Sequence, residues 1–217
     1  MLRNLNHRET TMLNMGIFVF SLFAFILTNL TSAQAFDYWG RIPSPNTQEV
    51  NLLSYNEDDV LYAAVWGDGL YRSEDDAQNF EQVNDGLTNL YITSIVYDSS
   101  DNMLVGTFGG GVFHSSDGGF SWTEFNDSLG NLNVKALAVN ANNDYFAGTY
   151  GGGVYRYVDS VGKWERVVYR LPFHDITALT IAPDSTILAG TNGDGIYKSS
   201  NNGNQWMSSN AGLEGKT

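Results

Sequence analysis

Short apolar stretches alternate with polar turns along the chain, and the whole pattern returns every 42 residues. The stretches are rich in Val, Ile, Leu, Tyr and Ala, whereas the turns are rich in Gly, Asn, Asp and Ser. This alternation is typical of short β-strands joined by tight turns. Gly67, Gly109, Gly151 and Gly193 hold the same place in four successive repeats, without a gap. A repeat of about 40–45 residues made of short strands predicts the blades of a β-propeller.

Each repeat contains four strand-like pieces. The first pieces are Val50–Tyr55, Ile92–Tyr97, Val134–Val139 and Ile176–Ile181. The second pieces follow a polar turn, at 60–65, 102–107, 144–149 and 186–191. A glycine-rich turn leads to the third piece, and the fourth starts at an aromatic residue: Phe80, Trp122, Trp164 or Trp206. We therefore expect an all-β fold, a β-propeller of four-stranded antiparallel blades with four blades present.

The repeats divide the chain into residues 50–91, 92–133, 134–175 and 176–217. Residues 36–49 are expected to form a closing outer strand and a linker. Tyr38 stands one repeat before Phe80, and Pro43 is expected to end the strand because proline cannot donate to a strand ladder.

The last residues match the loop that enters a repeat. Asn210, Gly212 and Leu213 correspond to Asn84, Gly86 and Leu87, which precede the second repeat. Fourth-strand pieces thus occur five times, and the other pieces occur four times. We expect the chain to be the N-terminal part of a ring of about six to eight blades. A four-bladed ring is the alternative.

Residues 1–35 have the pattern of a signal peptide. Arg3 and Arg8 precede an apolar run at 16–27, and Ala33 and Ala35 give the small residues of a cleavage site. The run is shorter than the roughly 20 residues that a membrane-spanning helix needs. The protein is therefore expected to be exported to the periplasm, the cell surface or the medium. The alternative to cleavage is that the signal segment stays on the protein as an N-terminal anchor. Contact with the membrane is expected only in that case.

Charge and composition exclude several kinds of site. The net charge of −13 disfavours binding to nucleic acid and to anionic lipid, because both carry negative charge. The chain contains no cysteine, so disulfides, thiolate metal ligands and cysteine nucleophiles are excluded. We expect no cofactor and no metal ion.

The turn from the third to the fourth strand carries a recurring motif. Ser115, Asp117, Gly119 and Trp122 fit the pattern S-x-D-x-G-x-x-W. The fourth repeat has Asn in place of Asp, with Ser199, Asn201, Gly203 and Trp206. The first repeat keeps only the Ser and the Asp of the motif, Ser73 and Asp75. The third repeat retains Asp159 and Trp164 but has Tyr157 in place of Ser.

This motif resembles the Asp-box, or bacterial neuraminidase repeat, of sialidases, sortilin-type receptors, xyloglucan hydrolases and photosystem II assembly factors. The resemblance extends from Tyr38 to Leu213. It implies that the boxes are structural and lie on the face opposite the binding site. Glycine permits the turn, the Asp carboxylate accepts backbone N–H groups, and Trp packs against the sheet. A Ca²⁺ role for Asp117 is the alternative, but the motif has too few oxygen ligands for a full set.

The turns between second and third strands share one face with the loops that enter each first strand. In the resembling families this face binds ligands. Its repeated position holds Trp66, Phe108, Tyr150 and Asn192. These aromatic residues are candidates for a platform that stacks on sugar rings or a peptide. The alternative is that they plug the channel or pack between blades.

Three further residues are candidates for this face. Asp68 and Asp194 interrupt the Gly-Gly-Gly pattern, and a carboxylate pair can perform acid–base chemistry on a glycosidic bond. Turn formation by Gly-Asp-Gly is the simpler explanation. His174 is a candidate acid or base, or a plain surface-loop histidine.

One repeated position suggests a different ligand. Arg72, His114, Arg156 and Lys198 share a place on the third strand, and resemblance to sialidases suggests a carboxylate-binding arginine set. Residues 41–43 read Arg-Ile-Pro, a short motif that sialidases also have. Blade packing is the alternative role for the repeated cations.

These observations lead to two functional hypotheses. The first is an exported, non-enzymatic propeller that presents its loop face to a protein, peptide or glycan. The second is a secreted glycoside hydrolase, either xyloglucan-type or sialidase-type, with further blades beyond residue 217.

Overall fold

The computed structural model describes residues 49–172 and 175–213, which belong to one compact unit, Pro43–Thr217. The predicted signal peptide, the closing strand at Tyr38, the Arg-Ile-Pro motif and His174 lie outside the described residues. Among the described residues, no helix is long and apolar enough to cross a membrane.

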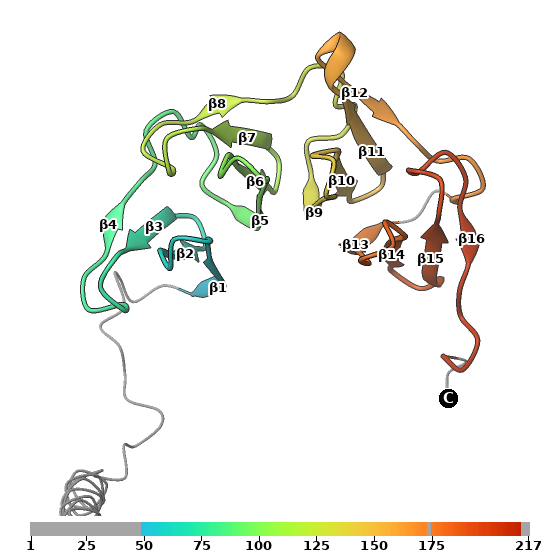
Figure 1. The fold of residues 1–217 in the computed structure, drawn as a ribbon, viewed down its shortest axis with the longest axis horizontal. Coiled ribbons are helices and arrows are strands. Elements are labelled where there is room, and N and C mark those ends of the chain that lie inside the picture. The colour runs from blue at the N-terminus through green and yellow to red at the C-terminus, as the bar shows by residue number, and fades with distance from the viewer. Residues whose placement is uncertain (1–48, 173–174, 214–217) are drawn as a thin grey trace, which may run out of the picture. The chain divides into compact units, whose positions relative to one another are not determined.

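The described chain forms four antiparallel sheets of four consecutive strands, which we call blades 1 to 4 (Figure 1). Blade 1 contains β1 (Val50–Tyr55), β2 (Leu61–Val65), β3 (Gly69–Ser73) and β4 (Glu81–Gln82). Blade 2 contains β5 (Ile92–Tyr97), β6 (Met103–Thr107), β7 (Gly111–Ser115) and β8 (Thr123–Glu124).

Blade 3 contains β9 (Val134–Val139), β10 (Tyr145–Thr149), β11 (Gly153–Val158), the 3-10 helix η1 (Asp159–Val161) and β12 (Lys163–Arg166). Blade 4 contains β13 (Ile176–Ile181), β14 (Ile187–Thr191), β15 (Gly195–Ser199) and β16 (Met207–Ser208). This arrangement confirms the predicted all-β propeller fold and its four-stranded antiparallel blades. The ring is not closed within the described residues.

The turns between first and second strands form because a polar side chain replaces the missing ladder partner. Asn56 Oδ1 accepts the N–H of Val60 at 2.9 Å, and Asp98 Oδ1 accepts the N–H of Asn102 at 3.0 Å. Asn140 Oδ1 does the same for Asp144 at 2.9 Å. Short Asx side chains favour such turns, which fixes where the second strands of blades 1 to 3 begin; blade 4 has Ala182 at this place.

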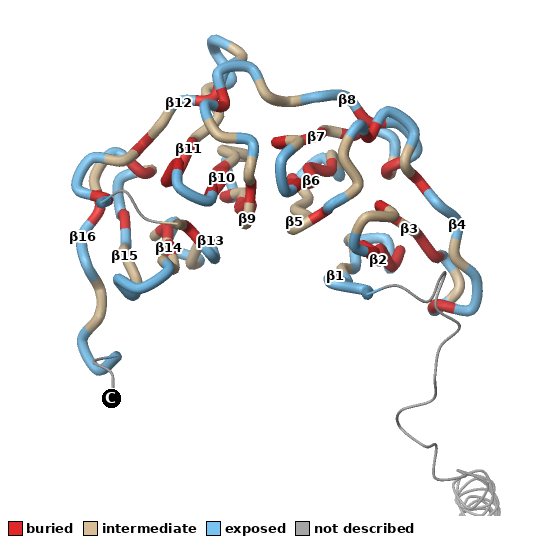
Figure 2. Tube along the Cα trace, turned by 180° about the vertical axis from the view of Figure 1, so that it is seen from behind, coloured by how far each residue is buried: buried red, intermediate tan, exposed pale blue. Residues whose placement is uncertain are grey.

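The blades pack face to face through apolar clusters. Trp122 between blades 1 and 2, Trp164 between blades 2 and 3, and Trp206 between blades 3 and 4 are at most 4% exposed. Each indole N–H donates to a carbonyl of the preceding blade: Val83 at 3.0 Å, Phe125 at 2.6 Å and Val167 at 2.8 Å, respectively. Burial is concentrated in the second and third strands of blades 1 to 3, whereas the fourth strands β4, β8 and β16 are exposed (Figure 2).

A register shift recurs near the start of each first strand, between Val50 and Leu52 in β1 and at the matching place in β5, β9 and β13. Such bulges redirect a side chain. The extra residues link neighbouring first strands: Asn51 Nδ2 donates to the Ile92 carbonyl at 2.7 Å, and Thr93 Oγ1 donates to the Val134 carbonyl at 2.9 Å. First strands therefore contact one another on the inner side of the blades.

Candidate functional site

The loop face consists of the turns between second and third strands and the loops that enter each first strand. In blade 2, Gly109 and Gly111 have φ angles of 99° and 81°, which a residue with a side chain rarely adopts. A Cβ added to Gly111 would lie 2.1 Å from Asn126 Oδ1. That oxygen accepts the Val112 N–H at 2.8 Å, and Asn126 Nδ2 donates to the Gly110 carbonyl at 3.0 Å. Glycine and asparagine together hold this turn.

The repeat pattern matched Asn84 with Asn210, but it did not predict that these asparagines hold the loop-face turns. Asn84 and Asn210 make the same pair of contacts in blades 1 and 4. Blade 3 has Val168 at this place, and Arg166 Nε donates to the Gly152 carbonyl at 2.6 Å instead. The spacing of 42 residues between Asn84 and Asn126 was the available signal.

The repeated aromatic residues have fixed backbones and exposed side chains. The N–H groups of Trp66, Phe108 and Tyr150 donate to carbonyls of Glu49, Tyr91 and Asn133 at 2.8–2.9 Å. In addition, Asn89 and Asn131 side chains donate to the Phe108 and Tyr150 carbonyls at 3.3 and 2.9 Å. The three aromatic residues remain 37%, 41% and 49% exposed, respectively. The backbone that carries each of these rings is therefore held in place by one or more hydrogen bonds.

Tyr91 joins this set, although the repeat did not single it out. It is 45% exposed, and its ring meets Trp66 edge-on with a centroid distance of 5.2 Å. Its repeat equivalents are Glu49, Asn133 and Asp175, so its position carries no aromatic pattern. We call Trp66, Tyr91, Phe108 and Tyr150 the aromatic row. Asn192, the fourth predicted member, is exposed and not aromatic.

Lys135 places a positive charge beside the aromatic row. Its Nζ lies 4.8 Å from the centroid of the Phe108 ring, a cation–π contact. Lys135 occupies the bulge position that Asn51 and Thr93 use to bond the next blade. No other Lys or Arg occurs in the four first strands.

The predicted carboxylates lie on different blades. Asp68 is half-buried in the turn of blade 1, where the Tyr71 hydroxyl donates to its Oδ2. Asp194 is exposed in the turn of blade 4, and its carbonyl accepts the Asn210 side chain at 3.0 Å. Two whole blades separate them in the sheet order, and both belong to turns that hydrogen bonds hold.

The box turns, from third to fourth strands, lie at the opposite end of each blade. Ser115 Oγ donates to Asp117 Oδ1 at 2.7 Å and accepts the Gly119 N–H at 2.9 Å. Asp117 also accepts the backbone N–H of Ser121 at 2.9 Å. The hydrogen bond from the Ser121 side chain lowers the pKa of Asp117 most, and its backbone contributes further.

The box turns of blades 1 and 4 have the same local geometry. Ser73 Oγ accepts the Ala77 N–H at 3.1 Å, and Asp75 accepts the Asn79 N–H at 2.8 Å. In blade 4, Asn201 accepts the Gln205 N–H at 2.9 Å. Within residues 49–172 and 175–213, no three His, Asp or Glu side chains are grouped to hold a metal ion.

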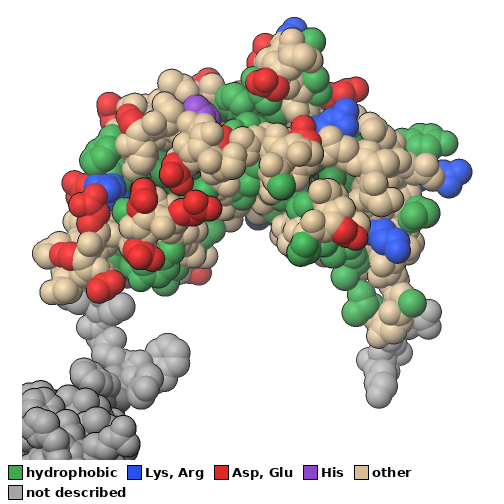
Figure 3. All heavy atoms as spheres, in the orientation of Figure 1, with side chains coloured by type: hydrophobic (Ala, Val, Ile, Leu, Met, Phe, Trp, Pro, Cys, Tyr) green, Lys and Arg blue, Asp and Glu red, His purple; other side chains and the backbone are tan. Residues whose placement is uncertain are grey.

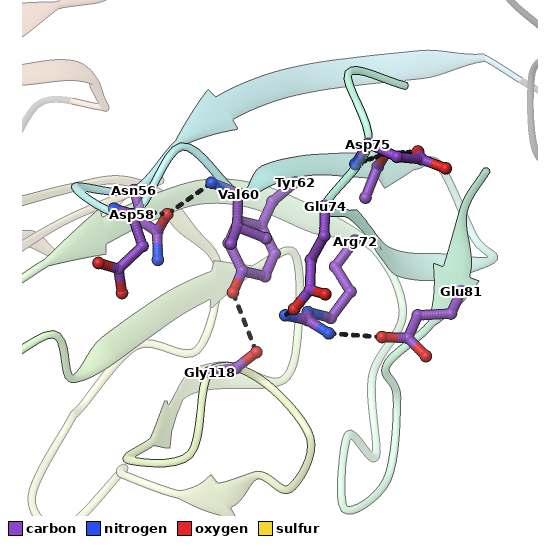
Figure 4. A network of polar contacts seen from close by, with 10 residues as sticks. Asn56, Asp58, Val60, Tyr62, Arg72, Glu74, Asp75, Glu81 and Gly118 are labelled. Atoms are coloured by element: carbon purple, nitrogen blue, oxygen red, sulfur yellow. Dashed lines mark hydrogen bonds and ion pairs between the residues drawn. The ribbon is translucent and has the colours of Figure 1, made fainter. Parts of the chain in front are cut away.

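The repeated cations of the third strands lie at blade borders. Arg72 pairs with Glu74 and with Glu81 (Figure 4). Its guanidinium also lies 4.5 Å from the Phe120 ring centroid. Arg156 Nη1 donates to the Asn202 carbonyl of blade 4 at 2.8 Å. Each bridges to the box turn of the next blade. The predicted carboxylate-binding role has no support from this placement, and the blade-packing alternative matches the contacts.

A hollow of about 450 Å³ lies beside Arg72, between blades 1 and 2 at the box end. The Tyr62 hydroxyl donates to the Gly118 carbonyl across it at 3.0 Å, as Figure 4 shows. Five carboxylates line the hollow: Asp58, Asp59, Glu74, Asp76 and Asp117. Those of Glu74 and Asp117 already bind groups of the protein.

Charge is unevenly distributed between the blades. Residues 50–91 contain nine acidic residues and one basic residue, whereas residues 134–175 contain four acidic and five basic residues. Acidic side chains gather over blade 1 on the visible face (Figure 3). Lys135 thus lies in the least acidic part of the described chain.

No protein family model and no curated protein matches the chain. Solved β-propeller structures do resemble it. The extracellular domain of a putative one component system from B. thetaiotaomicron has a TM-score of 0.63 at 20% identity, over 77% of this chain and 23% of that chain. A GH74 xyloglucanase from Xanthomonas campestris gives 0.62 at 18%, over 71% and 29%.

YCF48 bound to D1 peptide gives a TM-score of 0.55 at 15% identity, over 74% of this chain and 53% of that chain. The chain spans about a quarter of the length of the first two structures and about half of the third. At these identities, the similarity establishes the propeller fold.

Proposed function

We propose that the protein is an exported Asp-box propeller that binds a protein, peptide or glycan on its loop face. The observation that carries this proposal is the aromatic row, which exposes four large rings on one face. Large exposed apolar groups gathered on one surface are typical of binding sites. The Ser and Asp side chains of the box turns, by contrast, form hydrogen bonds within the protein.

The anchored backbones of the aromatic row favour binding. Asn131 donates to the Tyr150 carbonyl at 2.9 Å, and Tyr91 accepts the Phe108 N–H at 2.8 Å. A ligand that covers these rings therefore orders little additional chain. Preorganisation of this kind raises affinity because less conformational entropy is lost.

The structural neighbours support this class of function without selecting the ligand. YCF48 is bound to a peptide, and another neighbour is PorZ, a bacterial surface component of a secretion system. Several neighbours are extracellular domains or GH74 enzymes. Export of this chain rests on the predicted signal peptide at 1–35 and is part of the proposal.

Tryptophan fluorescence tests the proposal because one described tryptophan is exposed. Trp66 is 37% exposed, whereas Trp122, Trp164 and Trp206 are at most 4% exposed. Xyloglucan oligosaccharides and a peptide library serve as probes. We expect a bound probe to protect Trp66 from acrylamide quenching, and Trp66→Phe to remove that signal. A probe that binds without changing Trp66 quenching contradicts binding at the aromatic row.

A secreted glycoside hydrolase is the second candidate, because GH74 xyloglucanases are among the neighbours. In a hydrolase of this kind, Asp68 and Asp194 would be the candidate catalytic carboxylates. Release of reducing ends from xyloglucan, or of sialic acid from a sialylated glycan, tests this function. Loss of release in Asp68→Asn and Asp194→Asn supports catalysis by these residues. Binding of a glycan without release favours the first candidate.

A further inference from the structure

Lys135 differs from the other repeated cations because no carboxylate neutralises it. The chain has 24 Asp and Glu against 11 Lys and Arg. Arg72 and Arg156 form ion pairs with glutamates. Within the described residues, no carboxylate forms an ion pair with Lys135, whose half-buried side chain places Nζ 4.8 Å from the Phe108 ring centroid. Its positive charge can therefore pair with a ligand.

The repeat position of Lys135 otherwise holds short, uncharged side chains that bond to the backbone. Asn51 and Thr93 donate to carbonyls of the next blade at 2.7 and 2.9 Å, and Thr177 donates to a carbonyl of its own blade at 3.2 Å. Lys135 is longer and charged, and its ammonium lies over Phe108 on the loop face. A residue that departs from the structural pattern of its repeat in this way is a candidate for a role in binding.

The asparagines around the rings are engaged with the backbone at both ends of their amide groups. Asn89 Oδ1 accepts a backbone N–H at 2.9 Å, and its Nδ2 donates to the Phe108 carbonyl at 3.3 Å. Asn131 makes the same two kinds of bond, each at 2.9 Å, the second to the Tyr150 carbonyl. The turn asparagines are held in the same manner: Asn84, Asn126 and Asn210.

This engagement bears on the class of ligand. A neutral glycan presents many hydroxyl groups, and its recognition depends on polar side chains that are placed to bond them. The amides beside the aromatic row are oriented by the backbone, which restricts the hydrogen bonds that they can offer. The surface suits a ligand that is recognised by apolar contact and by one charge.

An aliphatic residue adds to the apolar surface at Phe108. The N–H groups of Gly109 and Gly111 both donate to the Leu132 carbonyl, at 3.1 and 2.9 Å, so Leu132 lies against the turn that carries Phe108. Leu132 is 41% exposed, as is Phe108. Mixed aliphatic and aromatic surface of this kind is typical of sites that bury the apolar side chains of a protein partner.

We propose that the loop face binds a peptide segment that carries one carboxylate among apolar residues. The carboxylate pairs with Lys135, and the apolar residue next to it packs on Phe108 and Leu132. Further apolar residues of the segment reach Trp66 and Tyr91. A polyanionic ligand is disfavoured, because the net charge of −13 repels it, whereas a single carboxylate gains from its contact with Lys135. This inference rests on the proposed function and specifies its partner.

Three sets of short synthetic peptides test the proposal. In the first set, Phe, Leu and Tyr surround one Glu, and both ends are blocked by acetylation and amidation. The second set has Gln in place of Glu, and the third has Gln and a free C-terminal carboxylate. We expect a carboxylate, from the side chain or from the chain end, to tighten binding at least about ten-fold over the second set. Equal affinities for all three sets overturn the proposal.

Lys135→Met removes the charge and keeps a long side chain. It should lower the affinity for the carboxylate peptides to that for the blocked Gln peptides, and Lys135→Arg should retain most of the preference. Lys163→Met is the matched control, because Lys163 is exposed at the box end of the same blade and its loss changes the net charge equally. A preference that survives Lys135→Met, or one that both Met variants lose equally, overturns the proposal. The melting temperatures should agree within a few degrees.

The same titrations separate this inference from the proposed function. Blocked Gln peptides or xyloglucan oligosaccharides that bind through Trp66, Phe108 and Tyr150, and ignore Lys135→Met, uphold the proposed function and overturn the carboxylate pairing. Carboxylate peptides that depend on Lys135 and also on these rings support both. A chain that binds none of the peptides or oligosaccharides overturns both.

Discussion

At the box turn of blade 2, Ser115 and Asp117 bond to groups of their own turn, and Trp122 is 4% exposed. At the opposite end of the blades, Phe108 and Tyr150 expose 41% and 49% of their surface although their backbones are bonded. The same repeat therefore places closed polar networks at one end and open rings at the other. If the proposed function holds, box substitutions should change stability and loop-face substitutions should change binding.

The largest expected effect comes from comparing two tryptophans. Trp122→Ala removes a buried indole and its 3.0 Å hydrogen bond to Val83, so it should lower the free energy of unfolding by about 3–5 kcal/mol. Trp66→Ala should cost less than about 1 kcal/mol because the ring is partly exposed. Denaturant unfolding of both variants measures the difference. Equal losses of unfolding free energy in the two variants would contradict the distinction between the box end and the loop face.

The next effect concerns acid stability of the box turns. Asp117→Ala should cost about 1 kcal/mol, since the Ser121 N–H loses its acceptor. The pKa of Asp117 is lowered in the folded protein, so its stabilising contribution is present above the unfolded pKa of about 3.9 and is lost as the pH falls through the folded pKa.

Blade 4 provides the natural control, because Asn201 holds the same place and does not titrate. Asp117→Asn should therefore keep much of the stability at pH 7 and weaken its loss below about pH 4. Thermal melts between pH 7 and pH 2.5 measure the change. An unchanged acid slope in Asp117→Asn would contradict the assigned hydrogen bonds.

The smallest effect concerns His114, between blades 2 and 3. Burial lowers its pKa, and its ring lies 5.6 Å from Phe125. The unfolded state then binds the proton more strongly, so stability should decline as the pH falls below about 6.5 and through the folded pKa. His114→Gln should flatten the melting temperature between pH 8 and pH 5. A profile that keeps its slope would show that His114 is not its source.

Much of the fold was predictable because each repeat carries its own local signals. The four first strands have the bounds that the pattern predicts, and Asn56, Asp98 and Asn140 mark the turns after three of them. The second strands begin one residue later than predicted, because the turn contacts extend to that residue. The repeat reveals these strand bounds and turns because every blade packs against its neighbours in the same way.

The site was less predictable because its members break the repeat. Tyr91 has no aromatic equivalent, and its contact with Trp66 joins the loops of two blades. Thr93 donates a hydrogen bond to the first strand of the next blade, whereas Lys135, at the same repeat position, lies over the Phe108 ring. These two contacts, of Tyr91 with Trp66 and of Lys135 with Phe108, join residues 25 and 27 positions apart, and such contacts depend on how the blades pack, which the local pattern does not contain. The catalytic role of Asp68 and Asp194 and the place of His174 stay predictions.

Blade 3 shows that the border between blades tolerates a different chemistry. Tyr157 replaces the box serine and packs against Phe125 at a centroid distance of 4.3 Å. Trp164 meets both rings edge-on at 5.9 and 5.5 Å. An aromatic cluster thus stands where the other borders have a polar box. What the three borders share is the indole N–H bond to the preceding blade.

The most direct test of the central claim is binding by a variant that combines Trp66→Ala, Phe108→Ala and Tyr150→Ala. Its control combines Tyr55→Ala, Val161→Ala and Met207→Ala, which are 55%, 62% and 49% exposed away from the loop face. Both variants and the unchanged chain are titrated with xyloglucan oligosaccharides and with a peptide array, and their melting temperatures are measured. The account predicts that the unchanged chain and the control bind one of these probes, and that the loop-face variant loses binding while melting within a few degrees of the others. Binding that persists without the three rings, or an unchanged chain that binds neither probe, would contradict it.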